Sequence, residues 1–328
     1  MIIPPVNGHR QQGIALLSVL FVVVILTVLV SQLLTLGWRN LERTQWLQDQ
    51  AQAYQYALGG EQLARQILFV RWQALREEGL NISPIPGPPA RYQPDRGEIR
   101  LQITDLQGRL NLNNIQDGNR RSTLQRFFAD TVQQPQLIAP LADWTDGDSL
   151  PRAGGQEDSH YLSQSQPYRA GNRLLAHWNE LKLLESNLEP DAFSHLGPWL
   201  TTLPGTTPLN INTLAAELAT LIHPGLSPVQ LAASQVQGGF QSTQAFLQNP
   251  ITAGLEIDTG AITVTSGFFQ AAVLATHGGF EQSLVSRFYF NPVTGDIDLL
   301  DRSLLMATLQ QRQLQDFTDF QDDTDTAL

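Results

Sequence analysis

Residues 10–30 read RQQGIALLSVLFVVVILTVLV, a short polar leader that passes directly into an apolar segment. The apolar run starts at Ile14, carries no charge as far as Val30, and contains only Ser18 and Thr27 as polar residues. Continued to Leu36 it reaches the roughly 20 residues that an α-helix needs to cross the hydrocarbon core of a bilayer. The sequence therefore predicts one membrane-spanning helix, with everything after Trp38 on one side of the membrane.

The junction at Gly13 differs from an ordinary secretory signal, in which a small-residue cleavage site follows the apolar region. Here no such site lies between the apolar run and the charged stretch that begins at Arg39. The small residue at the boundary is Gly13, on the near side of the helix. Cleavage after Gly13 would remove the leader and keep the helix, whereas an uncleaved signal anchor is the alternative interpretation.

The leader and helix resemble the type III leader of the type IV pilin and pseudopilin superfamily. The resemblance implies that a prepilin peptidase cuts after Gly13 and methylates the new N-terminus at Ile14. Most members carry Glu at the fifth residue after the cut, where this chain has Ser18. A buried carboxylate in a helix bundle needs a partner, which a neighbouring subunit's N-terminal amine can supply. A subunit without it needs no such neighbour, and this absence resembles the K-type minor pseudopilin family of the type II secretion system.

Composition sets limits on the function. The chain has 328 residues, so roughly 290 follow the membrane helix, enough for about two domains. The net charge is −11, which makes nucleic acid and anionic membrane surfaces poor partners. Cys is absent, which excludes a disulfide framework and thiol chemistry. Arg10 precedes the helix but Arg39 and Arg43 follow it, so the charge bias is weak and the orientation rests on the family resemblance.

The pattern after the membrane segment changes from helix to strand, to a long helical region and back to strands. Residues 38–79 have helical spacing, with Gly59–Gly60 as a candidate bend, and a Pro-rich loop follows at 83–94. Strict alternation predicts a strand at 98–105, and Arg109 opens either its partner or a new region. Residues 120–203 and 204–250 are predicted to be mainly helical. Later strands are predicted at 261–265, 268–276, 284–290 and 296–300.

This order predicts an α+β fold: a pilin-like long N-terminal helix packed on an antiparallel sheet, interrupted by a large inserted all-α domain. The layout again resembles the K-type pseudopilin. The predicted boundaries are a leader at 1–13, the transmembrane helix at 14–36, the pilin-like domain at 37–113 and 256–310, the insert at 114–255, and an acidic, disordered tail at 311–328.

An acidic loop carries the strongest chemical signal. Five carboxylates fall between Asp143 and Asp158, with Arg152 among them. Ca²⁺ accepts six to eight oxygen ligands from irregular loops, whereas Mg²⁺ rarely uses an all-protein cage. The spacing is not that of an EF-hand, and a solvated acidic loop is the alternative. The candidate calcium ligands are Asp143, Asp146, Asp148, Glu157 and Asp158.

The same loop adds to the family resemblance. It is similar to the stretch that contributes calcium ligands in the K family, and its Gly154-Gly155-Gln156-Glu157 element is offset by one residue from the usual form. The resemblance thus implies a structural calcium site. Trp144 is expected to pack into the helical core, and Tyr168, Asn172 and Glu180 extend the match as structural residues.

Residues 208–247 resemble a helix-hairpin-helix unit. Thr213 is the predicted helix N-cap, with Asn212 as the alternative, and Pro224-Gly225 makes the hairpin. In DNA-binding examples such hairpins hold phosphates with the help of basic residues. Residues 204–250 contain no Lys or Arg, so the unit is expected to pack or dock and not to bind nucleic acid.

No enzyme motif stands out. The six His residues are scattered, with no H-E-x-x-H, and neither G-x-S-x-G nor a P-loop occurs. Asp143 and Asp148 could form a glycosidase pair, but nothing else indicates a sugar cleft. The alternatives to a pseudopilin are a signal-anchored, calcium-dependent periplasmic hydrolase, a membrane-anchored DNA-uptake module and a minor pilin of a type IV pilus. The lack of a basic surface argues against the DNA-uptake module.

The resemblance implies a non-enzymatic tip subunit that starts the pseudopilus with I- and J-type minor pseudopilins. It further implies contact with the inner-membrane secretion platform. The chain would sit as a single-pass protein in the inner membrane, with its bulk in the periplasm.

Overall fold

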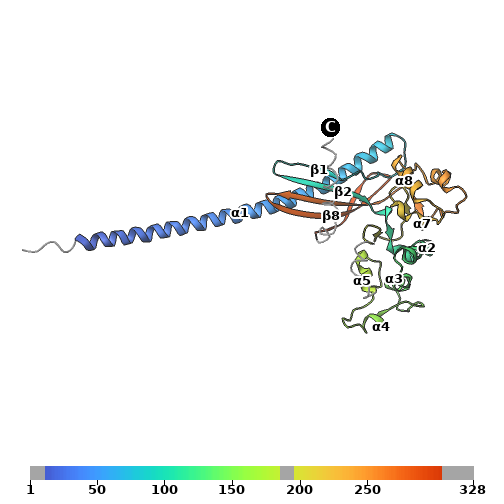
Figure 1. The fold of residues 1–328 in the computed structure, drawn as a ribbon, viewed down its shortest axis with the longest axis horizontal. Coiled ribbons are helices and arrows are strands. Elements are labelled where there is room, and N and C mark those ends of the chain that lie inside the picture. Colours follow the sequence, from blue (N-terminus) through green and yellow to red (C-terminus); the bar gives the residue numbers. More distant parts are fainter. Residues whose placement is uncertain (1–11, 185–195, 305–328) are drawn as a thin grey trace, which may run out of the picture.

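The computed structural model describes residues 12–184 and 196–304. A single helix, α1 (Gln12–Glu77), runs 66 residues without interruption and extends far beyond the rest of the molecule (Figure 1). Its N-terminal part is exposed, and an 18-residue window there has a mean hydropathy of 2.8, long and apolar enough to cross a membrane. The predicted transmembrane segment and the predicted helix at 38–79 are therefore parts of one element. The predicted tail at 311–328 lies outside the described residues.

The second half of α1 packs against a five-stranded antiparallel sheet in the order β1-β2-β7-β8-β9. Strands were predicted at 98–105, 268–276, 284–290 and 296–300, and the sheet confirms all four. The strand bounds are β1 (Ala90–Tyr92), β2 (Gly97–Asp105), β7 (Phe268–His277), β8 (Phe280–Phe290) and β9 (Ile297–Ser303).

Small residues let α1 approach the sheet closely. Ala57 and Ala64 are fully buried in the core between helix and sheet. A Cβ at Gly60 would lie 2.5 Å from Val273 Cγ1 and 3.0 Å from Ile99 Cγ2. The helix continues through the glycine pair that the sequence suggested as a bend, and Gly60 provides space for the sheet instead.

One buried carboxylate fastens α1 to the far edge of the sheet. Glu61 is fully buried and accepts hydrogen bonds from Arg302 at 2.6 and 2.8 Å and from Ser286 at 2.6 Å. Burial alone would raise the pKa of Glu61, but the bonds from Arg302 and Ser286 outweigh it and hold that pKa below its usual value. The pairing fixes the helix against both β8 and β9.

The connection from β2 to β7 covers residues 106–267 and forms the insert, which lies at the end of the molecule opposite the apolar end of α1 (Figure 1). Its helices are α2 (Gly118–Arg126), α3 (Ile138–Thr145), α4 (Asp158–Tyr161), α5 (Leu181–Leu184), α7 (Ala219–Ile222), α8 (Pro228–Val236) and α9 (Thr243–Leu247), with a π-helix η3 (Phe127–Thr131) and the 3-10 helices η1 (Leu106–Gly108), η2 (Leu112–Gln116), η4 (Pro135–Leu137), η5 (Trp178–Glu180), η6 (Ala216–Leu218) and η7 (Pro250–Thr252).

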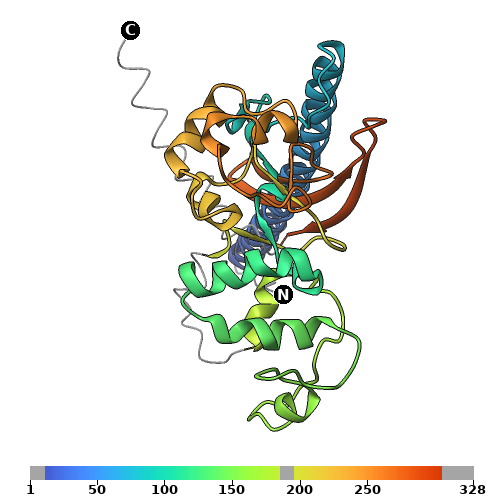
Figure 2. The same cartoon turned by 90° about the vertical axis from the view of Figure 1, so that its right-hand side faces the viewer.

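The insert is not purely helical. Two parallel strand pairs occur within it, β3 (Leu110–Asn111) with β4 (Leu200–Thr201) and β5 (Leu209–Asn210) with β6 (Ile262–Thr263). The strand predicted at 261–265 is therefore only two residues long and lies outside the main sheet. Figure 2 shows the insert as two separate helical groups, green and orange, and each group lies in the chain between the two strands of one pair.

The two strand pairs begin with similar sequences, LNLN at 110–113 and LNIN at 209–212. In both, the second Asn is buried and clamps a distant backbone segment. Asn212 accepts a bond from Phe240 N at 2.7 Å and donates to the same residue's carbonyl at 2.9 Å. Asn113 makes the equivalent pair with Leu175, at 2.9 and 3.1 Å. The insert thus contains two units built on one local plan.

The predicted helix cap at Thr213, or at Asn212, is wrong. The first helical turn after these residues, η6, has Ala215 at its N-cap and no side-chain cap bond. Asn212 is occupied by the Phe240 backbone, and Thr213 Oγ1 donates to Asp105 Oδ2 at 2.7 Å. Buried polar groups must be satisfied, so these side chains serve tertiary contacts in place of a helix end.

Asp105 joins the insert to the sheet. It is buried at the end of β2 and accepts hydrogen bonds from the side chains of Asn210 and Ser266, at 2.8 and 2.7 Å, as well as from Thr213. Its other oxygen accepts from Gln107 N at 2.8 Å. The carboxylate therefore holds together the strand that leaves the sheet, the second unit of the insert and the segment that returns to β7.

Candidate metal centre

The acidic loop leaves α3 and enters α4, and aromatic packing brings its two ends together. Trp144, in the last turn of α3, is only 3% exposed, as the sequence predicted for a core residue. Its ring meets that of Tyr161, at the end of α4, edge to face at 5.1 Å between centroids. Tyr168 stacks on Tyr161 at 5.3 Å. The loop between them is therefore anchored at both ends.

Three of the five predicted ligands converge. One carboxylate oxygen from each of Asp146, Asp148 and Glu157 lies within 4.8 Å of the other two. Asp146 ends α3 and Glu157 is the N-cap residue of α4, so the anchored loop ends place them opposite each other. The three side chains are graded in exposure, from the buried Glu157 to the exposed Asp148.

Three buried oxygens of this cluster lack a hydrogen-bond partner. Both carboxylate oxygens of Glu157 and Oδ1 of Asp146 are buried without a hydrogen-bond partner. Burial and the surrounding carboxylates, Asp143 first among them, raise the pKa of Glu157. Unpartnered oxygens of buried carboxylates are costly unless a cation or donor reaches them. The donor set therefore fits a hard cation such as Ca²⁺, whose preferred ligands are oxygens.

The structure places Asp143 beside this cluster in an ion pair. Asp143 is fully buried, its Oδ1 lies 2.8 Å from Arg152 Nη1, and its Oδ2 accepts from Arg152 N at 3.1 Å. The same guanidinium contacts Asp146. A Cβ at position 155 would lie 1.8 Å from Asp143 Oδ2, so Gly155 is required for this arrangement. Arg152, which the sequence marked only as a charge within the loop, organises two of the five carboxylates.

Asp158 faces away from the three-carboxylate cluster. Its Oδ1 accepts from Ala170 N at 2.9 Å, and its Oδ2 lies 3.4 Å from Arg169. Two other residues expected to be structural make such contacts: Asn172 donates to the carbonyl of Asp148 at 3.3 Å, and Glu180 accepts from the ring nitrogen of Trp144 at 3.4 Å. These bonds fix the segment after α4 around the loop.

A long helix with an apolar N-terminal half, packed on an antiparallel sheet that a large insert interrupts, is the architecture of a minor pseudopilin. A family model described as type II secretion system (T2SS), protein K matches residues 108–205. The type II secretion system protein K of Klebsiella pneumoniae is 34% identical over 268 residues, covering 74% of this chain and 81% of the relative. That of Pseudomonas aeruginosa is 30% identical over 299 residues, covering 84% and 88%. The chain belongs to the type II secretion system protein K family.

A solved structure shares the fold. A chain in the crystal structure of the GspK-GspI-GspJ complex from the enterotoxigenic Escherichia coli type 2 secretion system matches with a TM-score of 0.64 at 21% identity. The match covers 80% of this chain and 98% of that chain. The family assignment favours neither the hydrolase nor the type IV pilus alternative, and makes the protein a structural component of a secretion apparatus.

Proposed function

We propose that this minor pseudopilin sits at the tip of a type II secretion pseudopilus and initiates its assembly, in support of protein export across the outer membrane. The observation that carries the proposal is the place of the insert. Residues 106–267 lie at the end of the molecule opposite the apolar end of α1 (Figure 1). Subunits stacked along parallel helices would clash with this bulk above it, whereas a tip position leaves the space open.

Position 18 supports the same place in the assembly. Ser18 lies on the apolar part of α1, at the fifth residue after the proposed cut. A carboxylate there would need a neighbouring amine, because an unpaired charge within the membrane is costly. A tip subunit has no neighbour above it to supply that amine. Serine at this position removes the requirement.

The proposed partners are I- and J-type minor pseudopilins. The chain of similar fold comes from a structure of GspK with GspI and GspJ, which supports an equivalent assembly here. We infer further that a prepilin peptidase cuts after Gly13 and methylates Ile14. The mature chain would then be a single-pass inner-membrane protein with its bulk in the periplasm, in contact with the inner-membrane secretion platform and without catalytic activity.

We also propose that the acidic loop binds structural Ca²⁺. Asp146, Asp148 and Glu157 would hold the ion, because their oxygens converge and those of Glu157 lack other partners. Asp143 and Asp158 would support the loop through Arg152 and the backbone of Ala170. A bound divalent ion would neutralise the cluster and tie the end of α3 to the start of α4.

The tip proposal is tested by changing position 18. Ser18→Glu introduces a carboxylate that has no amine above it at a tip. Secretion of an exported reporter and co-purification with the I- and J-type partners should therefore fall several-fold. Ser18→Ala is the matched control and should behave as wild type. Unchanged secretion and complex formation in Ser18→Glu would contradict the tip position.

A further inference from the structure

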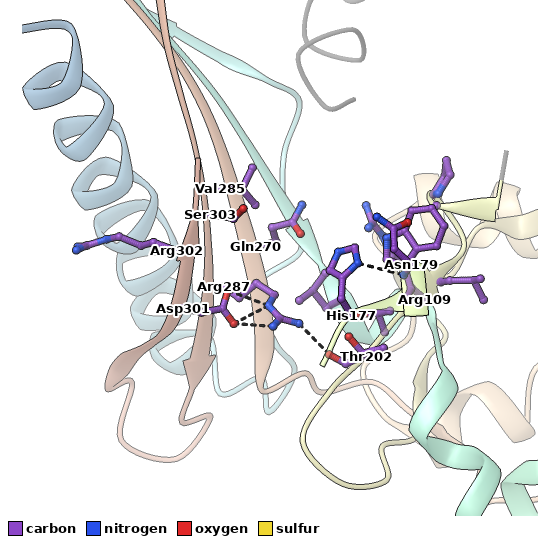
Figure 3. A pocket seen from close by; sticks show the side chains of 16 residues that line it. Arg109, His177, Asn179, Thr202, Gln270, Val285, Arg287, Asp301, Arg302 and Ser303 are labelled. Carbon is purple, nitrogen blue, oxygen red and sulfur yellow. Dashed lines mark hydrogen bonds and ion pairs between the residues drawn. The ribbon is translucent and has the colours of Figure 1, made fainter. Parts of the chain in front are cut away.

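A cavity of about 390 Å³ lies between the insert and the face of the sheet that points away from α1 (Figure 3). Strands β7, β8 and β9 form one wall, with Val285 and Arg287 among its residues. Arg109, His177 and Trp178 belong to the opposite wall, contributed by the insert. The volume is within the range of ligand sites, and the acidic loop contributes no residue to it.

The cations around the cavity are not equivalent. Arg287 is paired with Asp301 at 2.6 Å and donates to the carbonyl of Thr202 at 2.9 Å. Arg302 is paired with Glu61 on the α1 side of the sheet. Within residues 12–184 and 196–304, the guanidinium of Arg109 makes no hydrogen bond or ion pair.

Arg109 is therefore a half-buried cation without a direct partner among these residues. Burial lowers its pKa to about 10, and the negative charge of Asp105 acts in the opposite direction. Asp105 makes no direct bond to the guanidinium, because its two oxygens are directed to the four donors that they already accept from. A half-buried cation of this kind is further stabilised by an anion that enters the cavity.

The neighbouring residues define the rest of the ligand. His177 Nδ1 accepts from Asn179 N at 3.1 Å, which leaves the ring proton on Nε2 as a donor. Burial and the charge of Arg287 lower the pKa of His177, so the ring is neutral at neutral pH. Trp178 and Val285 add apolar surface. A ligand with a carboxylate next to an aromatic or aliphatic group matches these features.

We propose that this cavity binds an acidic peptide segment, with a carboxylate at Arg109 and an adjacent apolar side chain against Trp178. A peptide is favoured because β9 ends at the cavity with Ser303, and the chain continues into a sequence of this chemistry. Residues 314–325 read LQDFTDFQDDTD, in which carboxylates alternate with Phe. The segment that binds is this one, supplied by the same chain.

The test uses the full chain in detergent and a fluorescent peptide of residues 314–325, with binding followed by anisotropy. A matched peptide with every Asp replaced by Asn should bind about tenfold more weakly or worse, as should the Arg109→Gln variant. Arg96→Gln removes an exposed cation outside the cavity and should bind as wild type. Val285→Trp, which keeps Arg109 but fills the cavity, should abolish binding, and thermal unfolding checks that each variant is folded.

A chain that ends at Leu304 tests whether the chain's own segment is the occupant. Because that segment fills the cavity of the full chain, the shortened chain should bind the peptide at least tenfold more tightly than the full chain. Equal binding by both chains would mean that the chain's own segment does not occupy the cavity, and would overturn the proposal. Lack of binding to both chains would overturn the proposal, and so would equal binding by folded Arg109→Gln.

Discussion

At the scale of a single residue, the environment of the Glu157 carboxylate explains the chemistry of the acidic loop. Its oxygens are buried without hydrogen bonds, and the carboxylates of Asp146 and Asp148 face it. Taken alone, this arrangement is destabilising, because like charges and desolvation act together. A divalent cation turns the same arrangement into a stabilising one. The loop is therefore expected to be the part of the insert whose stability depends most on calcium.

Calcium should raise the unfolding temperature of the full chain in detergent, relative to the same protein in EGTA. At about 100-fold excess over Kd, the gain is expected to be about 5 °C or more. Glu157→Gln should lose most of this gain. In EGTA, it should be at least as stable as wild type, because an unpaired buried charge has been removed. Glu281→Gln, an exposed change on β8, is the control. A chelator that leaves the wild-type transition unchanged would exclude the calcium site.

The sequence predicted the acidic residues but not how the loop sorts them. Local spacing gives Asp143 and Asp146 equal standing as ligands. Arg152 contacts both, but both oxygens of the buried Asp143 are bonded by Arg152 beside Gly155, whereas Oδ1 of Asp146 has no hydrogen-bond partner. The contacts that separate these carboxylates depend on how the loop folds back on itself, and residue spacing alone does not predict them. Arg109 was missed for the same reason, because its place in the cavity depends on how the insert packs against β7, β8 and β9.

At the scale of elements, the packing of α1 on the sheet depends on a glycine pair with unequal neighbours. A Cβ at Gly60 would collide with Val273 on β7, whereas a Cβ at Gly59 would have no atom within 4 Å. Glycine costs about 1 kcal/mol relative to alanine in a helix interior. The close approach of Val273 therefore requires glycine at position 60, whereas no neighbouring atom requires it at position 59.

The two alanine variants should therefore shift stability in opposite directions. Gly60→Ala is expected to destabilise the chain by about 1–3 kcal/mol through overpacking against Val273. Gly59→Ala should stabilise it by up to about 1 kcal/mol, because only the helix propensity changes. Urea denaturation followed by circular dichroism measures both. Equal effects of the two changes would mean that α1 does not lie on the sheet in this register.

Long elements with a regular hydrophobic pattern could be predicted from the sequence, whereas short elements could not. The alternation of Ile99, Leu101 and Ile103 gave β2, because every second side chain enters the core under α1. The two-residue strands of the insert are too short to show any period. The failed cap at Thr213 has a related cause, since a long-range bond to Asp105 replaced the local one.

The whole molecule combines a membrane helix at one end with a bulky insert at the other (Figure 1). The sheet lies between them, and Glu61 and Asp105 fasten it to α1 and to the insert. In a chain of this shape, assembly through parallel helices can proceed below the insert but not beyond it. The overall shape and Ser18 together are the basis for the proposed tip position.

The account depends most directly on the N-terminus of the mature protein. Mass spectrometry of the chain purified from membranes should find a protein that begins at Ile14 with a methylated amine, because the proposed cut after Gly13 removes the leader and keeps the apolar helix. The mass of a chain that still carries Met1, or one that has lost the helix, would contradict the pseudopilin account.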